Sequence, residues 1–142
     1  MISGFFVPAM LPQPLVLMAV QVDEFGPGFA TVPFVVDTGA AFTCIHAMDA
    51  IRYFGRTPAQ LDPATWTGAE TIGGVGGSLQ YARSPANYVL KRDDGAMESV
   101  NGNILFSDMR SSRLPSLMGW DLLRLFRLEV HGPNQTVTLE RL

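Results

Sequence analysis

Residues 34–40 read Phe-Val-Val-Asp-Thr-Gly-Ala, and this is the most informative stretch of the sequence for fold and chemistry. Its apolar, largely β-branched beginning predicts a buried strand. The strand runs into Asp37, so a carboxylate leaves the core where the chain turns. Gly39 lets another backbone or a ligand come close, and the Thr38 hydroxyl can donate and accept hydrogen bonds. Taken alone, the tripeptide is more typical of an Asx-type turn that closes a strand.

The composition predicts a single globular domain over residues 1–142. Of the 142 residues, 47% are hydrophobic and 16% charged, which is too apolar for a disordered chain. A net charge of −3 offers no basic footprint for nucleic acid. One cysteine excludes an internal disulfide, and with only two histidines no metal site is expected. Prolines interrupt the apolar residues 1–20 and no basic residue precedes them, so we expect neither a signal peptide nor a membrane span, and a cytoplasmic location.

Short strands and turns dominate the rest of the sequence, which predicts a mainly β fold with one to three short helices. Asp94-Gly95 and Asn101-Gly102 are both hairpin signals. Strands are expected over 15–22, 29–36, 42–45, 78–83, 86–92, 97–100, 104–106, 128–130 and 136–140, and helices over 46–54, from 62–63 onward and over 120–126.

Two further segments are unusual. Residues 72–77 read Ile-Gly-Gly-Val-Gly-Gly, and residues 117–123 read Leu-Met-Gly-Trp-Asp-Leu-Leu. Together with residues 34–40, and in this order, they resemble the retropepsin-like aspartic proteases: the catalytic loop, the flap tip, and the apolar-apolar-Gly turn with its closing helix. The resemblance spans residues 14 to about 130.

The sequence combines features of two branches of this family and departs from the retroviral branch at one pair of positions. The glycine-rich segment looks retroviral, whereas Gly119-x-Asp121 and the insertion at 46–70 look more like the cellular DNA-damage-inducible branch. Retroviral members usually have an acid after the Asp-Thr-Gly-Ala run, paired with an arginine after the later glycine. Here these positions are Ala41 and Trp120. Because both partners of the ion pair are absent, no charge is left uncompensated. The dimer contact that this ion pair makes in retroviral members is therefore not expected here.

The resemblance implies a closed acid-protease barrel with a flap hairpin, one lobe per chain, and catalytic residues Asp37, Thr38 and Gly39. Thr38 would bond across the dimer axis, and Gly39 would present its backbone to substrate. No cofactor or metal is implied. Core packing is an equal alternative for Leu117 and Met118, and a flexible loop is the alternative for 72–77. The residues implied to bind substrate are Ala40, Ile72, Gly73, Gly74, Val75, Gly76, Gly77, Leu117 and Met118.

The chemistry itself argues for two chains. Aspartic proteolysis needs two carboxylates that share one proton, because two like charges that close cannot both ionise. The sequence contains Asp-Thr-Gly once. We therefore expect an obligate homodimer with Asp37 of each subunit at a two-fold axis, acting on an apolar site in a peptide or protein.

Other residues carry weaker expectations. Cys44 is expected to be a small buried hydrophobe rather than a redox switch. His46 and His131 are expected at the surface or at helix ends, and Trp66 and Trp120 in the core or an interface. The apolar terminal segments 2–7 and 137–139 are candidates for a dimer sheet.

Three functional interpretations remain open. The first is an active homodimeric aspartic endopeptidase. The second is a catalytically silent retropepsin-like module that binds peptides or dimerises. The third is a small ligand-binding β-barrel in which Asp37 is merely structural. The intact Asp-Thr-Gly and the ordered trio of segments favour the first.

Overall fold

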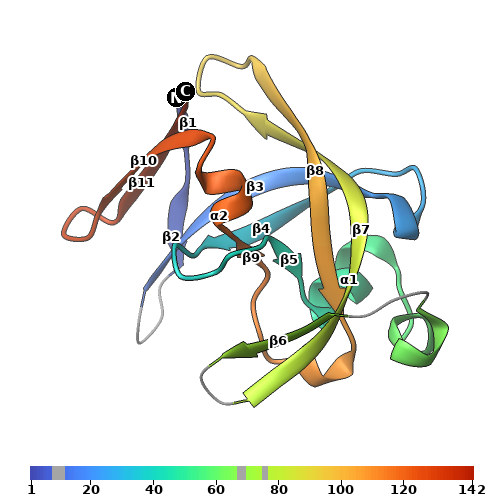
Figure 1. Ribbon diagram of the computed structural model, residues 1–142. Helices are drawn as coiled ribbons and strands as arrows, with labels where there is room; N and C mark the ends of the chain where they lie inside the picture. Colours follow the sequence, from blue (N-terminus) through green and yellow to red (C-terminus); the bar gives the residue numbers. More distant parts are fainter. Residues whose placement is uncertain (8–11, 67–69, 75–76) are drawn as a thin grey trace.

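The computed structural model describes residues 1–7, 12–66, 70–74 and 77–142, and it is mainly β, as expected (Figure 1). The strands are β1 Ile2–Ser3, β2 Phe5–Val7, β3 Gln13–Val22, β4 Ala30–Val36, β5 Cys44–Ile45, β6 Glu70–Gly74, β7 Gly77–Lys91, β8 Met97–Ser107, β9 Leu117–Met118, β10 Phe126–His131 and β11 Thr136–Arg141. The α-helices are α1 Ala47–Phe54 and α2 Trp120–Leu123, and the 3-10 turns are η1 Asp23–Phe25, η2 Ala59–Leu61, η3 Pro63–Thr65 and η4 Met109–Ser111.

The strands form two sheets. The larger has the order β2-β3-β4-β9-β5-β8-β7-β6, and β7 also pairs with β3. Strand pairing therefore runs in a ring from β3 through β4, β9, β5, β8 and β7 back to β3, while β6 stays at an edge. The smaller sheet has the order β1-β11-β10 and holds both termini, which lie together in Figure 1.

The core lies inside this ring because the strands alternate apolar residues toward it. Val16, Met18 and Val20 of β3 are fully buried, as is Phe34 of β4. Helix α1 adds a buried apolar face and ends at Gly55, whose φ of 64° is left-handed and suits glycine.

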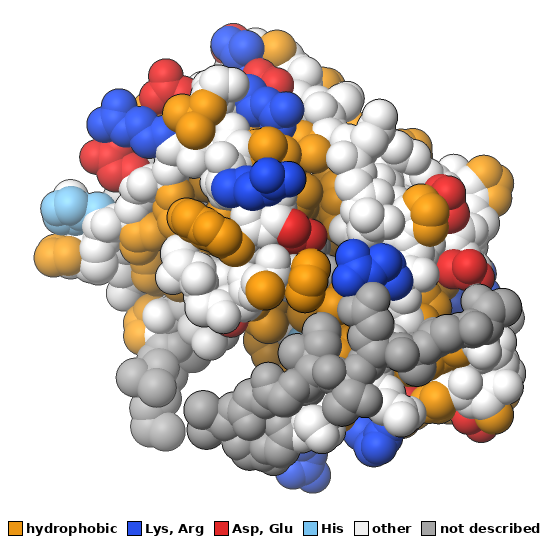
Figure 2. Space-filling model, in the orientation of Figure 1, with side chains coloured by type: hydrophobic (Ala, Val, Ile, Leu, Met, Phe, Trp, Pro, Cys, Tyr) orange, Lys and Arg blue, Asp and Glu red, His pale blue; other side chains and the backbone are white. Residues whose placement is uncertain are grey.

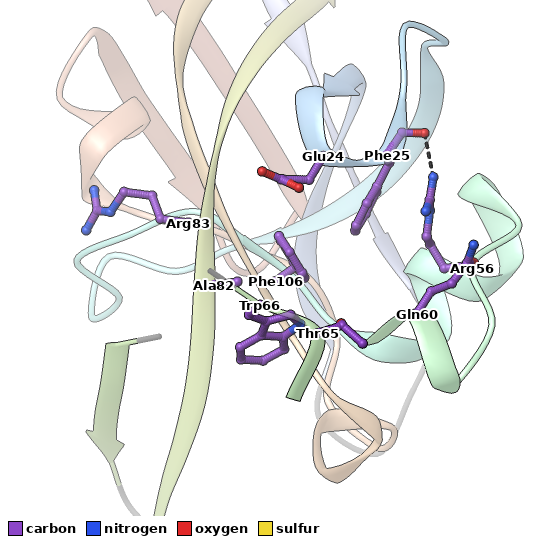
Figure 3. Close-up of a pocket in the computed structure, with 9 residues that line it drawn as sticks. All are labelled: Glu24, Phe25, Arg56, Gln60, Thr65, Trp66, Ala82, Arg83 and Phe106. Atoms are coloured by element: carbon purple, nitrogen blue, oxygen red, sulfur yellow. Dashed lines mark hydrogen bonds between the residues drawn. The ribbon is translucent and has the colours of Figure 1, made fainter. Parts of the chain in front are cut away.

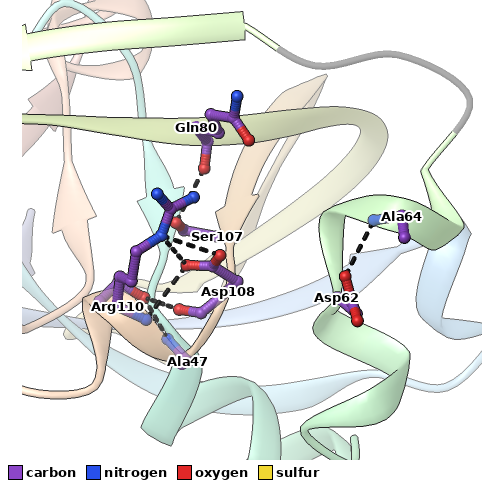
Figure 4. A network of polar contacts seen from close by, with 8 residues as sticks. Ala47, Asp62, Ala64, Gln80, Ser107, Asp108 and Arg110 are labelled. Atoms are coloured by element: carbon purple, nitrogen blue, oxygen red, sulfur yellow. Dashed lines mark hydrogen bonds and ion pairs between the residues drawn. The ribbon is translucent and has the colours of Figure 1, made fainter.

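Polar contacts anchor α1 to the loop after β8 (Figure 4). The Ala47 N–H donates to Ser111 Oγ at 2.9 Å, and Ser111 Oγ donates to the Asp108 carbonyl at 2.8 Å. Beside them, Arg110 Nε pairs with the Asp108 carboxylate at 3.0 Å. The expected helix start at Asp62-Pro63 is confirmed as a 3-10 turn, capped by Asp62.

The hairpin signals had different outcomes. Asp94-Gly95 forms the expected turn, with a φ of 89° at Gly95. Asn101-Gly102 was expected to turn as well, and this prediction was wrong, because β8 runs straight through it. These residues pair with Asn87 and Ala86 of β7, in a ladder that continues on both sides. The long-range ladder therefore outweighs the local turn preference. Similarly, β7 is one strand through Pro85, not two.

The terminal segments pair within one chain. Ile2 lies opposite Leu139, and β10 and β11 form the expected hairpin. Val137 and Leu139 are 1% and 0% exposed and belong to the chain's own core. Their side chains are therefore not available to a second subunit, and a dimer sheet would use the edges of β1 or β10.

Candidate active site

Asp37 lies directly beyond the buried end of β4. Its N–H donates to the Met118 carbonyl at 3.1 Å, which extends the parallel pairing of β4 with β9 by one bond. The Asp37 carbonyl in turn accepts from the Ala40 N–H at 3.2 Å, closing a tight turn. Asp37 is half-buried, and Thr38 and Gly39 are exposed. The turn thus presents the three residues expected to be catalytic at the surface.

One oxygen of the Asp37 carboxylate has a local partner. The Gly39 N–H donates to Oδ1 at 2.9 Å, which is the Asx-type turn that the tripeptide alone predicts. A Cβ at Gly39 would lie 3.2 Å from the same oxygen, so glycine gives the tight approach its room. The described residues supply no hydrogen bond to Oδ2. The turn therefore orients the carboxyl group and leaves one oxygen available.

Behind this turn, Gly119 packs against the backbone of Phe42. A Cβ at Gly119 would lie 2.4 Å from the Phe42 carbonyl carbon, so only glycine fits. The buried Thr43 hydroxyl accepts from the Gly119 N–H at 3.0 Å and donates to Asp121 Oδ1 at 2.7 Å. Asp121 Oδ1 also accepts from the N–H groups of Thr43 and Leu122, both at 2.9 Å. This buried network joins Thr43, six residues beyond Asp37, to the segment 117–123.

Backbone hydrogen bonds hold the turn at Ala40, Ala41 and Trp120. The Trp120 N–H donates to the Ala40 carbonyl at 2.8 Å, and the Asp121 N–H donates to the Ala41 carbonyl at 3.1 Å. Trp120 is 52% exposed, so it is not a core residue. A large apolar ring therefore stands at the surface next to the Asp37 turn.

The glycine-rich segment forms part of a hairpin. Ile72, Gly73 and Gly74 lie in β6, and Gly74 pairs with Gly77 at the start of β7. Val75 and Gly76 lie outside the described residues. In Figure 1 the hairpin projects from one end of the molecule. Because β6 is the last strand of its sheet, its outer edge has no partner strand within the described residues.

The two residues of β9 differ in burial. Leu117 is half-buried and packs with Cys44, Tyr81 and Leu105. Met118 is 0% exposed and belongs to the main core. The expectation that Met118 lines a substrate pocket is therefore corrected in favour of core packing, since parallel pairing with Val36 turns its side chain inward. For Leu117 and Ala40, both half-buried, substrate binding remains a prediction.

Of the two positions expected for His46, the helix end is confirmed, since His46 is the N-cap residue of α1, and the surface position is not. It is 1% exposed. Its Nδ1 faces the Pro115 carbonyl, which can only accept, so Nδ1 carries the proton. Its Nε2 then accepts from the Tyr81 hydroxyl at 2.8 Å. Burial lowers the pKa of His46, against smaller opposite effects of the Pro115 carbonyl and Asp49. Only tertiary packing reveals this residue, because no motif surrounds it.

Cys44 completes this buried polar cluster of Cys44, His46 and Tyr81. It is 5% exposed, and its Sγ lies 3.6 Å from His46 Nε2. Burial raises the pKa of its thiol to about 12, and burial raises the pKa of the Tyr81 phenol to about 12. Neutral forms are therefore favoured, and the expected role of Cys44 as a small buried hydrophobe is confirmed.

A separate cavity of about 100 Å³ lies away from this turn, between η1, η3 and β8 (Figure 3). Aromatic rings line it, among them Trp66, which meets Phe106 edge-on at 5.6 Å between ring centroids. The described residues bring no three His, Cys, Asp or Glu side chains together as metal ligands. Nor does any helix among them have the length and apolar character to cross a bilayer.

Comparison with known proteins gives matches only among solved structures. No protein-family model and no curated protein matches the chain. EIAV protease complexed with the inhibitor HBY-793 is 16% identical, over 83% of this chain and 91% of that chain, with a TM-score of 0.47. The retroviral protease-like domain of Ddi1 from Leishmania major is 13% identical, over 90% of each chain, with a TM-score of 0.42. Both are of the kind that the three sequence segments resemble.

Proposed function

We propose that the protein is an aspartic endopeptidase that works as a homodimer, with Asp37 of each subunit at the two-fold axis. The observation that carries the proposal is the Asp37-Thr38-Gly39 turn. It is exposed, it leaves one carboxylate oxygen without a partner among the described residues, and the Gly119–Thr43–Asp121 network holds it from behind. Half of a carboxylate pair is present per chain, so a second copy is needed for the chemistry.

In the proposed reaction the two carboxyl groups hold one proton and a water molecule between them. The ionised carboxylate takes a proton from the water, which attacks the scissile carbonyl carbon. The protonated carboxyl group donates its proton to the carbonyl oxygen. Collapse of the resulting diol, with proton transfer to the amide nitrogen, breaks the peptide bond. Thr38 of each subunit would bond across the axis beneath the pair, and Gly39 would present its backbone to substrate.

An extended peptide suits the surfaces around this turn. The open edge of β6 offers backbone hydrogen bonds to an added strand. The hairpin with residues 72–77 would close over the peptide as a flap, with Ala40, Ile72 and Leu117 beside apolar side chains. The exposed Trp120 ring next to the turn is the surface we assign to contact with the second subunit.

The test is cleavage of a diverse peptide mixture between about pH 3 and pH 8, read by mass spectrometry, with Asp37→Asn as the matched variant. We expect cuts beside apolar residues in the wild-type protein, a bell-shaped pH profile, and a loss of roughly a hundredfold to ten-thousandfold in the variant. Cuts that persist in Asp37→Asn contradict the proposal. No cuts by a protein shown to be dimeric favour the silent peptide-binding module instead.

The dimer is tested separately by sedimentation velocity at micromolar concentration. Trp120→Glu places a charge on the proposed contact and is expected to shift the protein toward monomer and to lower activity in parallel. Met97→Glu, at another exposed apolar residue, in the β7–β8 hairpin, is the control and should leave both unchanged. A wild-type protein that is monomeric yet active contradicts the two-chain mechanism.

A further inference from the structure

Three arginines from distant parts of the chain rim one cavity of about 390 Å³. Arg83 comes from β7, Arg124 follows α2, and Arg141 ends β11. We call this cavity the arginine pocket. Figure 2 shows basic side chains near the centre of one face of the molecule. The chain has 10 basic residues and a net charge of −3, so three arginines at one cavity are a local reversal of its overall charge.

The opposing charge in the arginine pocket is limited. Asp121 is its one acidic lining residue within the described part of the chain. Asp121 Oδ1 already accepts three hydrogen bonds, from the Thr43 N–H, the Thr43 hydroxyl and the Leu122 N–H. In the described lining, Arg124 and Arg141 therefore outnumber the single carboxylate of Asp121, and Ser99, Asn101 and Asn103 add polar groups.

Arg124 and Arg141 are held by contacts that leave their guanidinium groups at the rim, whereas Arg83 has further interactions of its own. The Arg83 guanidinium lies over the Phe42 ring at 5.0 Å, and that of Arg141 lies over the Phe126 ring at 5.4 Å. Arg124 Nε donates to the Asp121 carbonyl at 3.2 Å. All three side chains are exposed. Stacked and anchored guanidinium groups of this kind are suited to carboxylates, which accept paired N–H bonds.

The arginine pocket adjoins the Asp37 turn. Phe42, which lines the pocket, is five residues beyond Asp37, and the Asp121 N–H donates to the Ala41 carbonyl. We propose that the arginine pocket binds the carboxylates of an acidic segment in the peptide substrate, beyond the apolar residues at the scissile bond. This inference rests on the proposed function in taking the bound peptide to be the substrate.

The experiment separates binding from turnover by using Asp37→Asn protein. The probe is a fluorescein-labelled peptide in which adjacent glutamates flank an apolar stretch. Its binding is measured by fluorescence anisotropy at low and high salt, and compared with that of the same peptide with glutamine in place of each glutamate. We expect the glutamate peptide to bind more tightly, with the preference lost at high salt. Because the arginines are exposed, each is expected to contribute roughly twofold to fivefold in affinity. General charge attraction does not explain such a preference, since the chain is net negative.

Arg124→Gln and Arg141→Gln, singly and together, should lower the glutamate preference stepwise. Arg127→Gln is the matched control, because Arg127 is exposed on β10 and does not line the pocket. Thermal unfolding verifies that the variants fold. Equal binding of the two peptides, or a preference that survives the double variant or falls equally with Arg127→Gln, overturns the inference.

Cleavage by the wild-type protein distinguishes the two proposals. If apolar sites are cut equally well with and without nearby glutamates, the proposal of an aspartic protease is supported and the arginine pocket is refuted as a specificity site. If nothing is cut but the arginine-dependent glutamate preference remains, the protease is refuted and acidic-peptide binding by the pocket is supported.

Discussion

The Asp37 turn and the buried polar cluster lie on opposite sides of β9, and they differ in the burial and hydrogen bonding of their polar groups. The cluster of Cys44, His46 and Tyr81 is buried, its hydrogen bonds are internal, and burial favours the neutral form of each member. The Asp37 carboxyl group instead stands at the surface with one oxygen open to an incoming partner. The buried cluster therefore holds neutral structural groups, and the proposed chemistry sits where the backbone exposes a carboxyl group.

The two regions depend on each other through the packing between them. Gly119 and Thr43 support the turn from inside, and β9, next to the cluster, supplies the carbonyl that holds Asp37. Substitutions at these contacts should therefore disturb the Asp37 turn most, and substitutions in the buried polar cluster should disturb it less.

The largest effect is expected for Gly119→Ala. Its new Cβ would lie 2.4 Å from the Phe42 carbonyl carbon, and backbone cannot move aside cheaply. We expect a loss of about 3 kcal/mol in the free energy of unfolding, together with loss of activity. Urea unfolding measures it. Gly28→Ala is the control, since a Cβ there meets nothing within 4 Å. Similar stabilities of the two variants would contradict the close contact.

Thr43→Val should have the next largest effect. The substitution keeps the shape but removes the hydroxyl, which leaves the Gly119 N–H without its acceptor and Asp121 Oδ1 with one donor fewer. We expect a cost of about 2 kcal/mol in the free energy of unfolding. Thr43→Ser keeps the hydroxyl and should cost less. If serine and valine are equally destabilising, the hydroxyl does not support the turn.

His46 should make the stability of the folded protein depend on pH. Burial lowers its folded-state pKa below the usual 6.5, so the unfolded chain takes up a proton first. The stabilisation present above about pH 6.5 is therefore lost as the pH falls from there toward the folded-state pKa, by at most about 1.4 kcal/mol per pH unit. Melting temperatures of wild-type and His46→Gln protein between pH 5 and 7.5 measure this slope.

The matched control for that slope is His131→Gln, because His131 is exposed on β10. It should retain the wild-type pH dependence, whereas His46→Gln should flatten it. A slope that disappears in both variants, or in neither, contradicts the role given to His46.

The smallest effect on stability is expected at Cys44. Cys44→Ala removes one buried sulfur and should cost about 1 kcal/mol. In the native protein the thiol should resist alkylation at pH 8, because it is buried and its pKa is about 12. Unfolded protein provides the fully reactive control. Rapid modification of native Cys44, with a change in activity, would support the redox switch that burial argues against.

Several features were predictable from the sequence because they depend on neighbouring residues. Strand β4, the turn at Asp37 and the Asp94-Gly95 hairpin follow from apolar runs, a short polar side chain and a glycine at a position of positive φ. Sequence reasoning also joined residues 34–40, 72–77 and 117–123 into one site, and the structure places the first and last of these together through the pairing of β4 with β9 and the bond from the Trp120 N–H to the Ala40 carbonyl.

Other features were decided only by tertiary structure. Asn101-Gly102 stays extended because β7 supplies a full ladder, and Met118 turns inward because it pairs with Val36 of β4. His46 is buried because Pro115 and Tyr81 satisfy its ring nitrogens. The three arginines of the pocket come from β7, the end of α2 and β11, so no local pattern relates them. By itself the sequence determined the local conformation where no long-range pairing competed with it, and the residue types that carry the proposed chemistry. Which of those residues face water, the core or one another depended on strand pairings between distant segments, whose energies no short stretch of sequence contains.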